Sequence, residues 1–364
     1  MLAFAGMFVQ AGAADRPGIG TTSAAGEIAP RQLIPAGDSR FRYEGRVDFS
    51  DPAGPMVIWQ GSRIRLDFEG NQLALRFAAA TGQNFFNAEV DGVNVIVAVR
   101  ETPVQSVEVP LPSGPGRHQL VLFKRSEATK GQVRFQGVEL AAGAQAWTPA
   151  APAYRLKMEF FGDSITVGAC NEDGAIDQWK DFRTHNHALS YATLTSAAFA
   201  ADHRCVAVSG MGIASGWTDI RAGRTWDRLY PREDSPPAEL QTWQPDVAFV
   251  LLGENDDSFP RAHGQPFPSA FRAGYVSLVR AMRATYPHTR IVLLRGGMFG
   301  GAQSVELREA WTAAVKELET GDTAVSHFVF THWSTTHPRV SDDRAMADEL
   351  IVWLKAQPFM QRFL

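Results

Sequence analysis

The spacing of apolar residues changes near residue 150, and this change limits the possible folds more than any other feature of the sequence. In the first half, apolar residues alternate with polar or charged ones, as in residues 63–68 (RIRLDF). Such alternation is typical of strands with one buried face. Four more segments are expected to be strands: 73–77, 86–90, 118–125 and 132–140. Short strands at these intervals, with Asp91-Gly92 as one hairpin turn, predict a β-sandwich.

In the second half, short apolar segments alternate with helical patterns. Strands are expected at 157–161, 205–209, 246–252, 290–294 and 327–330. The helices expected between and after them cover 271–282 with Ser269 as N-cap, 307–318 between Ser304 as N-cap and Gly321, and 343–357 with Asp342 as cap. This alternation predicts a parallel sheet covered by helices on both faces. In such sheets, binding sites lie beyond the carboxyl ends of the strands.

The two patterns divide the chain into domains. The proline-containing stretch 147–154 is expected to be a linker, with a β-sandwich domain at 38–146 and an α/β domain at 155–364. Residues 15–37, rich in Gly, Ala, Pro and Thr, are expected to be a loose arm. Residues 1–14 form a short apolar run that ends in small residues, like the remnant of a signal peptide without its charged start. A secreted or periplasmic protein is therefore expected.

Composition excludes several classes of function. The formal net charge is −4 and no cluster of Lys and Arg is present, which argues against a nucleic-acid partner. The sequence contains no run of about 18 apolar residues, so no membrane span is expected.

Cys170 and Cys205 either pair, as in an exported protein, or remain buried thiols. His185 and His187 lack a third ligand nearby, so no metal or other cofactor is expected. The sequence leaves the oligomeric state open.

Four residues with complementary chemistry follow the ends of four expected strands. Ser164 follows the first strand within Gly-Asp-Ser, where a hydroxyl is exposed at a helix start, and Gly210 follows the second, where backbone approaches a ligand closely. Asn255 follows the third and offers a neutral amide donor. His337 follows the fifth and is a natural general base. Each signal has an ordinary structural explanation by itself, but their order is nucleophile, backbone donor, side-chain donor and base.

Over about residues 155–360, this set resembles the GDSL-like hydrolase superfamily, also called SGNH. The resemblance implies a three-layer, flavodoxin-like α/β domain with Ser164 as nucleophile and His337 as base. It also implies an oxyanion hole formed by the N–H groups of Ser164 and Gly210 and the amide of Asn255. The superfamily usually carries Asp three residues before the His, whereas this chain has Ser334.

We therefore expect a Ser–His dyad. A main-chain carbonyl between Trp333 and Thr336 is expected to hold Nδ1–H of His337 in place of the missing carboxylate. Asp342 and Asp343 suit that role less well, because they lie beyond His337 at a helix start.

The N-terminal half is similar to the jelly-roll domain of family-2 carbohydrate esterases. The similar stretches are 59–62 (WQGS), 90–92 (VDG), 123–127 (FKRSE), Gly131 and 135–137 (FQG). These enzymes join such a domain to a GDSL-like one, and the family is known for a dyad whose His is held by a backbone carbonyl. The resemblance implies deacetylation of O-acetylated sugars or polysaccharides, such as acetylated xylan or glucomannan, without a metal.

Other functions remain open at this point. The chain is alternatively a GDSL-like lipase or thioesterase acting on acyl chains, or a glycan-binding protein with a vestigial esterase site. Trp217, Phe299 and Trp333 lie after or beside expected strand ends and are candidates for stacking on sugar rings. The alternative for each of these aromatic residues is an ordinary place in the core.

Overall fold

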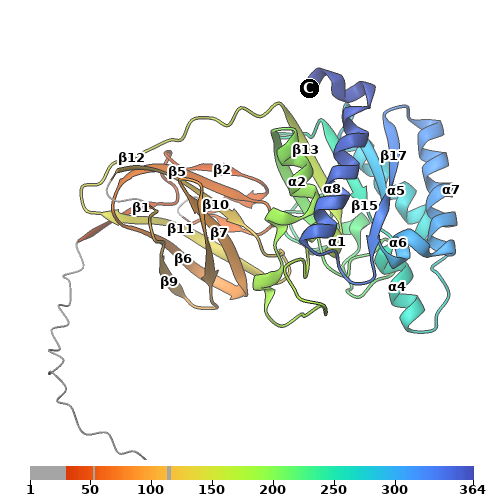
Figure 1. Ribbon diagram of the computed structural model, residues 1–364, viewed down its shortest axis with the longest axis horizontal. Coiled ribbons are helices and arrows are strands. Elements are labelled where there is room, and N and C mark those ends of the chain that lie inside the picture. Colours follow the sequence, from red (N-terminus) through yellow and green to blue (C-terminus); the bar gives the residue numbers. More distant parts are fainter. Residues whose placement is uncertain (1–29, 52–53, 113–115) are drawn as a thin grey trace, which may run out of the picture.

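The computed structural model describes residues 30–51, 54–112 and 116–364, which form two domains side by side (Figure 1). The N-terminal domain consists of two antiparallel sheets around a common apolar core. The first sheet has the order β3 (Val47–Asp48), β4 (Met56–Val57), β11 (Gly131–Ala141), β6 (Leu73–Gly82) and β9 (Val104–Glu108), with β1 (Arg31–Pro35) on β11. The second has the order β12 (Ala146–Trp147), β5 (Arg63–Gly70), β10 (Gly116–Lys124), β7 (Asn84–Val90) and β8 (Val93–Val99), with β2 (Arg42–Glu44) on β5.

The alternating pattern in the sequence forms this sandwich as predicted. In β5, the apolar residues Ile64, Leu66 and Phe68 are at most 1% exposed, because every second side chain of a strand points into the core. Asp91 and Gly92 form the two-residue turn between β7 and β8 with φ values of 51° and 82°. Positive φ at both positions suits the right-handed twist of a hairpin.

Two of the expected domain boundaries are wrong by a few residues. Residues 31–35, expected within the arm at 15–37, form β1 and pair with β11. Trp147, expected in the linker, belongs to β12 and pairs with Asp67 of β5. Residues 1–14, expected to be a signal remnant, and residues 15–29 of the arm lie outside the described residues.

The C-terminal domain is built on a five-stranded parallel sheet. Its order is β14 (Ala201–Ala207), β13 (Leu156–Gly162), β15 (Val247–Leu251), β16 (Arg290–Met298) and β17 (Val325–Ser334). The chain starts at β13, adds β14 on one side and then continues on the other side with β15, which is the flavodoxin-like order that was predicted. The carboxyl ends of β13 and β15 therefore border the point where the strand order reverses, and ligands bind at such points.

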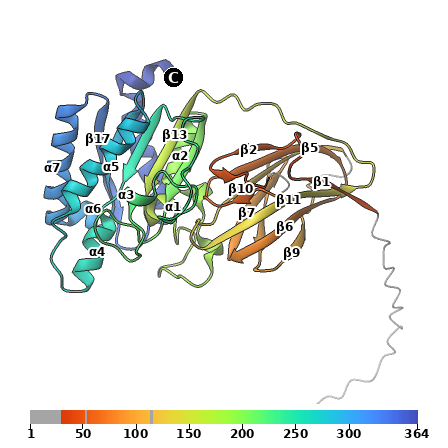
Figure 2. The same ribbon diagram turned by 180° about the vertical axis from the view of Figure 1, so that it is seen from behind.

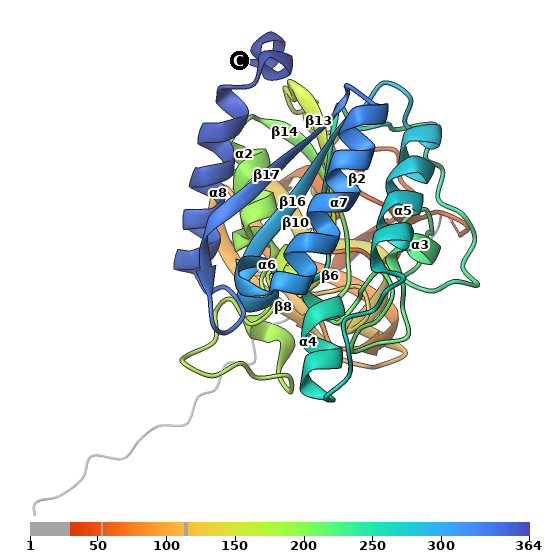
Figure 3. The same cartoon turned by 90° about the vertical axis from the view of Figure 1, so that its right-hand side faces the viewer.

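Helices cover both faces of this sheet (Figure 3). On one face, α2 (Tyr191–Ala198) and α8 (Val340–Lys355) pack around the buried ring of Phe160. On the other face, α5 (Phe271–Thr285) and α7 (Val305–Gly321) pack against Val250 and Leu293. The shorter helices are α1 (Ser164–Val167), α3 (Ala222–Thr225), α4 (Glu254–Ala262), α6 (Phe299–Gln303), η1 (Phe182–Thr184), η2 (His187–Leu189) and η3 (Pro358–Phe363).

The helix caps differ in part from expectation. Ser304 caps α7 as predicted, because its side chain accepts a hydrogen bond from the N–H of Leu307. The N-cap of α5 is Ala270 and not Ser269, and the helix begins at Phe271. Asp342 is not a cap but lies inside α8, where its carboxylate accepts the N–H of Arg339 at 2.8 Å and so allows an earlier start.

The two domains share an apolar core. Ile58 and Trp59 of the sandwich are buried in the same cluster as Phe161 of β13. Trp59 Nε1 also donates to the main-chain oxygen of Leu229 across the interface at 2.8 Å. The connecting segment between β12 and β13 runs along the outside of both domains (Figures 1 and 2). Among the described residues, no helix is both long and apolar enough to cross a membrane.

Candidate active site

A cavity of about 440 Å³ lies at the carboxyl ends of the parallel strands. Ser164, Gly210, Asn255 and His337 all line it, although 173 positions separate the first from the last. The structure therefore brings together all four residues that were singled out at the strand ends. Lys130 of the sandwich domain also lines this cavity.

Ser164 is the first residue of α1, directly after β13. Asp163 caps this short helix, and its carboxylate accepts the N–H of Ile165 at 3.1 Å. The Ser164 side chain is 3% exposed and faces the cavity. Its own N–H donates to no acceptor in the described part of the chain, so this N–H is available to a ligand.

Ser164, His337 and Asp177 form a continuous hydrogen-bonded series. The Oγ of Ser164 lies 2.8 Å from Nε2 of His337, and Nδ1 of His337 lies 2.7 Å from Oδ2 of Asp177. The same carboxylate oxygen accepts the main-chain N–H of His337 at 3.2 Å. Because Nδ1–H donates to the carboxylate, the lone pair of Nε2 faces the serine hydroxyl.

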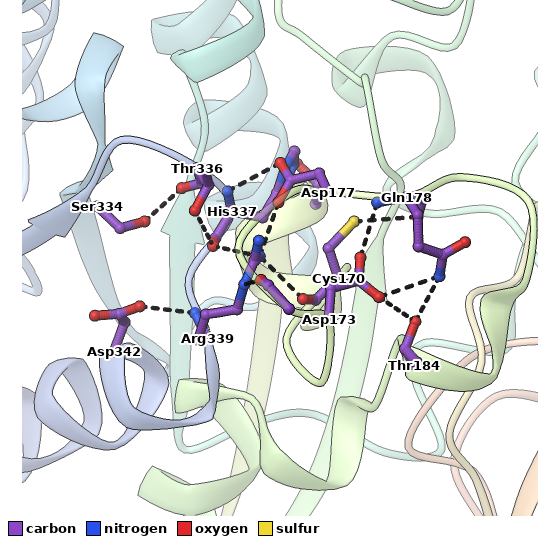
Figure 4. Close-up of polar contacts among 12 residues, drawn as sticks. Cys170, Asp173, Asp177, Gln178, Thr184, Ser334, Thr336, His337, Arg339 and Asp342 are labelled. Carbon is purple, nitrogen blue, oxygen red and sulfur yellow. Dashed lines mark hydrogen bonds and ion pairs between the residues drawn. The ribbon is translucent and has the colours of Figure 1, made fainter. Parts of the chain in front are cut away.

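The expected carbonyl partner of His337 is therefore wrong, and so is the expected dyad without a carboxylate. Asp177 occupies that position from a different part of the chain, the loop between α1 and α2 (Figure 4). Ser334 cannot replace it, because its hydroxyl donates to the main-chain oxygen of Thr336. Asp342 and Asp343 have other partners: Asp342 binds the start of α8, and Asp343 accepts the N–H of Tyr191.

The charge of Asp177 is stabilised despite partial burial. Burial alone raises the pKa of this carboxyl group, but the hydrogen bond and charge of His337, together with Arg339, outweigh it and hold the pKa below its ordinary value. Arg339 Nη1 lies 2.8 Å from Oδ1 of Asp177. Asp177 is therefore ionised throughout the neutral and mildly acidic range.

Sequence reasoning missed Asp177, and little in the sequence distinguishes it. It lies thirteen positions after Ser164 in a segment that also contains Glu172, Asp173 and Asp181. Only the fold shows which of these acidic residues reaches His337. Asp173, for example, binds Thr184 and Gln178 within the same loop (Figure 4).

The turn after β14 presents the N–H of Gly210 to the cavity. Gly210 has φ = 84°, and this N–H donates to no acceptor among the described residues. The sequence indicated a strand up to residue 209, but the strand ends at Ala207. The N–H of Ser209 donates to the carboxylate of Glu127 and not to a neighbouring strand.

Asn255 lies at the start of α4, beside this turn. Its Nδ2 donates to the main-chain oxygen of Met211 at 2.9 Å and to Oδ2 of Asp163 at 3.2 Å. Both amide hydrogens thus have acceptors within the protein. Asp256, the next residue, accepts the N–H groups of residues 213, 214 and 215 and fixes the far side of the turn.

Aromatic side chains border the cavity. Trp217 lines it as expected and is 53% exposed, with Nε1 donating to Oγ of Ser258 at 3.0 Å. Phe299 and Trp333 pack against one another and are not among the described residues that line the cavity. Sequence reasoning missed Trp179, which lines the cavity and places its ring 5.1 Å from that of His337.

The cysteines and the remaining histidines have separate environments. Cys170 and Cys205 are both free and buried, so they do not form a disulfide. Nε2 of His187 lies 2.8 Å from Nε2 of His203, whereas Nε2 of His185 lies 3.5 Å from Sγ of Cys170. His185 and His187 thus do not share a ligand position.

Within the described part of the chain, two sets of side chains have atoms close enough to hold a metal ion, and both include Cys170. One set adds Asp177 and His337, and the other adds Asp173 and His185. Burial raises the pKa of the Cys170 thiol well above its ordinary value. This disfavours the thiolate that a metal requires.

Two parts of the chain match known protein families. Residues 43–152 match the carbohydrate esterase 2 N-terminal domain. Residues 160–348, more than half of the chain, match the GDSL-like lipase/acylhydrolase family. The chain belongs to the GDSL-like lipase/acylhydrolase family. The GDSL-like match includes Ser164, Gly210, Asn255 and His337, whereas Lys130 lies in the part that matches the carbohydrate esterase 2 N-terminal domain.

Relatives of this GDSL-like protein cover both of its domains. The cellulase/esterase CelE of Acetivibrio thermocellus is 30% identical over 324 residues, which are 86% of this chain and 39% of CelE. The chain thus spans less than half the length of that relative. An acetylxylan esterase / glucomannan deacetylase of Cellvibrio japonicus is 28% identical, covering 85% of this chain and 89% of that protein.

Solved structures agree with this assignment. A family two carbohydrate esterase from Clostridium thermocellum in complex with cellohexaose is 28% identical with a TM-score of 0.77, covering 86% of this chain and 98% of that one. The GDSL-like domain and the preceding sandwich are therefore shared with family-2 carbohydrate esterases.

Proposed function

We propose that the protein is a carbohydrate O-acetyl esterase, in which Ser164 is the nucleophile, His337 the general base and Asp177 the orienting carboxylate. The observation that carries this proposal is the series of hydrogen bonds from Ser164 Oγ through His337 to Asp177 at the wall of the cavity. A serine, a base and a carboxylate in this arrangement form the acyl-transfer triad found on several unrelated folds.

In the first step, His337 Nε2 takes the proton of Ser164 while Oγ attacks the acetyl carbonyl carbon. The carbonyl oxygen then carries a negative charge. The free N–H groups of Ser164 and Gly210 are available to it, and the amide of Asn255 is the third donor. One donor of this kind typically contributes roughly 3 kcal/mol to the rate.

In the second step, the tetrahedral intermediate collapses and the bond to the sugar oxygen breaks. His337 gives its proton to that oxygen, and the deacetylated sugar leaves an acetyl group on Ser164. Water then attacks this ester, with His337 again taking the proton. Collapse of the second intermediate releases acetate and restores the serine hydroxyl.

A carbohydrate substrate is supported by the relatives and by the cavity. One relative is an acetylxylan esterase / glucomannan deacetylase, and a structural neighbour is in complex with cellohexaose. Trp217 and Trp179 line the cavity with exposed aromatic surface, on which the apolar face of a sugar ring can stack. Acetylated xylan and glucomannan are therefore the proposed substrates. Because such polymers lie outside the cytoplasm, we also propose a secreted or periplasmic location.

Acetate release from a panel of acetylated polysaccharides tests this function. We expect release from acetylated xylan or glucomannan by the wild type and none by Ser164→Ala. Turnover of Ser164→Ala at the wild-type rate would exclude Ser164 as nucleophile. A higher kcat/KM for octanoyl than for acetyl esters would favour a lipase or thioesterase. Tight binding of the polysaccharide without acetate release would indicate a binding protein.

A further inference from the structure

The sandwich domain touches the active site at several points, although the proposed triad and oxyanion donors all belong to the α/β domain. The loop between β10 and β11, residues 125–130, reaches the cavity through Lys130. Within this loop, Arg125 is 2% exposed and Glu127 is fully buried. On the basis of the proposed function, we propose that Glu127, Arg125 and the nearby Gln83 are positioning residues, so that catalysis itself requires the sandwich domain.

Glu127 positions the turn that carries the Gly210 N–H. One of its oxygens accepts the main-chain N–H of Ser209 at 3.0 Å, and the other accepts the hydroxyl of Ser209 at 2.6 Å. Both carboxylate oxygens therefore bind the residue directly before Gly210. The peptide group between Ser209 and Gly210 supplies an oxyanion donor, and Glu127 determines its direction.

Arg125 positions both ends of the loop that carries Asp177. Its Nη2 is paired with the carboxylate of Glu172 and donates to the main-chain oxygen of Arg183 at 2.7 Å. Its Nη1 donates to Oδ1 of Asn87 at 3.0 Å, which anchors the guanidinium in the sandwich domain. Glu172 and Arg183 flank Asp177 in sequence, so one buried side chain holds the loop on both sides of the catalytic carboxylate.

Gln83 holds the same loop at a third place, between β6 and β7 of the sandwich. Its Nε2 donates to the main-chain oxygen of Lys180 at 2.8 Å, and its Oε1 accepts the N–H of Phe182 at 3.1 Å. Both polar atoms of the Gln83 amide thus form hydrogen bonds with main-chain groups of the loop. Main-chain contacts of this kind fix the path of the loop and hence the place of Asp177.

Gln83→Ala tests the link to Asp177, because this half-buried side chain can be removed without opening the core. We expect kcat on p-nitrophenyl acetate to fall by about 10-fold or more with KM changed less than about 2-fold, since a small misplacement of a catalytic group mainly lowers the rate of the chemical step. In the Asp177→Asn background, Gln83→Ala should lower kcat no further, because it acts through Asp177. Gln119→Ala, an exposed residue of the same domain, is the matched control.

Glu127→Gln tests the link to the oxyanion turn. The carboxylate accepts one hydrogen bond from Ser209 on each oxygen, whereas the NH₂ group of the Gln amide can only donate. One of the two bonds is therefore lost, and we expect a lower kcat with little change in KM. This effect should add to that of Asp177→Asn, because the two act on different parts of the site. Ser209→Ala, which removes only the hydroxyl bond, replaces Glu127→Gln if that variant does not fold. Glu69→Gln on the exposed face of β5 is the control.

The outcomes separate this inference from the proposed function. If folded Gln83→Ala and Glu127→Gln both turn over at the wild-type rate, the positioning role is wrong while the esterase assignment stands. If Gln83→Ala lowers kcat equally in the wild-type and Asp177→Asn backgrounds, the link through Asp177 is wrong. If the wild type itself releases no acetate, the proposed function fails first.

Lys130 carries a second and independent inference about the substrate. Its ammonium group lies 5.9 Å from the ring centroid of Trp179 and 5.4 Å from that of Phe182, and none of the described carboxylates is paired with it. The carboxylate of Glu254, which also lines the cavity, is instead bound by the N–H groups of Gly300 and Gly301.

We propose that Lys130 binds the carboxylate of an acidic sugar, so that the enzyme favours acetyl groups on or next to a uronic acid. A charged donor that has no carboxylate partner at a substrate cavity gains more from a carboxylate than from a neutral hydroxyl. This inference also rests on the proposed function and names its substrate class.

A matched pair of substrates tests it: methyl glucuronide and methyl glucoside acetylated at the same hydroxyl. We expect the wild type to have a severalfold higher kcat/KM for the glucuronide, and this ratio to fall to about 1 in Lys130→Met and to shrink at high salt. Lys316→Met, on the exposed face of α7, should keep the wild-type ratio. A wild-type ratio of 1, or a ratio that persists in Lys130→Met, would overturn the proposal even if both esters are hydrolysed.

Discussion

His337 is held from both sides by groups that belong to different parts of the chain. Ser164 lies at Nε2 and Asp177 at Nδ1, and Arg339 contacts the same carboxylate. The carboxylate therefore determines which ring nitrogen carries the proton and which one faces the serine. The usual position for this carboxylate, three residues before the His, is occupied by Ser334, so the same chemistry is achieved from a separate loop.

Asp177→Asn should lower kcat by roughly 10²- to 10⁴-fold, because an amide at Nδ1 no longer favours the productive tautomer. KM for p-nitrophenyl acetate should change little. Steady-state kinetics measure both values, with Asp234→Asn on the exposed surface as control. A kcat within about 2-fold of wild type would mean that another group, such as a main-chain carbonyl, orients His337.

Asn255→Ala should lower kcat by about 100-fold or more, as expected for loss of one oxyanion donor. Because Nδ2 also binds Met211 and Asp163, part of the loss reflects a turn that is held less firmly. Asn255→Asp retains the shape but replaces the donor with an acceptor, and it should be at least as slow. An unchanged kcat for both variants would remove Asn255 from the oxyanion hole.

Individual residues were predictable from the sequence where their position follows from a strand end. Ser164, Gly210, Asn255 and His337 directly follow strands of one parallel sheet, so their convergence follows from the topology. Asp177 was not predictable, because its place depends on the path of an irregular loop that contains several acidic residues. That path depends in turn on contacts from Gln83 and Arg125, which lie in the other domain.

At the scale of elements, strands with a clear alternation of apolar and polar residues were predictable, whereas the short strands β2, β3, β4 and β12 and the helix starts were not. Period-two alternation defines a strand such as β5 locally, because each buried side chain is two residues from the next. The start of α8 depends on a hydrogen bond from Arg339 to Asp342, which no hydrophobic pattern records. The strand β1 lies in a segment rich in small residues, and only its pairing with β11 makes it a strand.

A buried pair of histidines links η2 to β14 and predicts a dependence of stability on pH. Burial lowers the pKa of His187 to about 3 and that of His203 well below its ordinary value, so both are neutral in the folded state. In the unfolded state they bind protons below about pH 6.5. Stability is therefore complete above that pH and is lost as the pH falls from about 6.5 towards 3. At pH 5, His187 alone accounts for about 2 kcal/mol.

Chemical denaturation at pH 7.5 and pH 5 measures this effect. His187→Gln should be less stable at pH 7.5 but should lose less stability between the two values. His288→Gln, an exposed histidine, should behave like the wild type. Equal losses in His187→Gln and the wild type would show that other groups cause the acid sensitivity.

At the scale of the whole molecule, the two domains form one structural unit. Arg46 of the sandwich and Glu159 of β13 make an ion pair of 3.0 Å with both side chains at most 2% exposed. Arg46 also donates to the main-chain oxygen of Trp226 at 2.7 Å, and Tyr286 donates to the other Glu159 oxygen at 2.9 Å. This buried network lies beside the apolar core that both domains share.

Arg46→Met should lower the free energy of unfolding by about 3–5 kcal/mol, because it leaves the Glu159 carboxylate buried without its counter-charge. Arg224→Met, which breaks an exposed pair with Glu233, should cost less than about 1 kcal/mol. Denaturant titration measures both. A loss below about 1 kcal/mol for Arg46→Met would mean that the interface tolerates separation of the pair and that the domains are less dependent on one another.

The most direct test of the esterase chemistry is to trap the covalent intermediate. The wild type is mixed with p-nitrophenyl acetate, quenched with acid in the first turnovers, digested and mapped by mass spectrometry. Because p-nitrophenolate leaves readily, the acetyl-enzyme should accumulate. We expect one acetyl group on the peptide that contains Ser164, and none on that peptide in Ser164→Ala. Rapid turnover with the acetyl group absent from Ser164, or attached to another residue, would contradict the proposed mechanism.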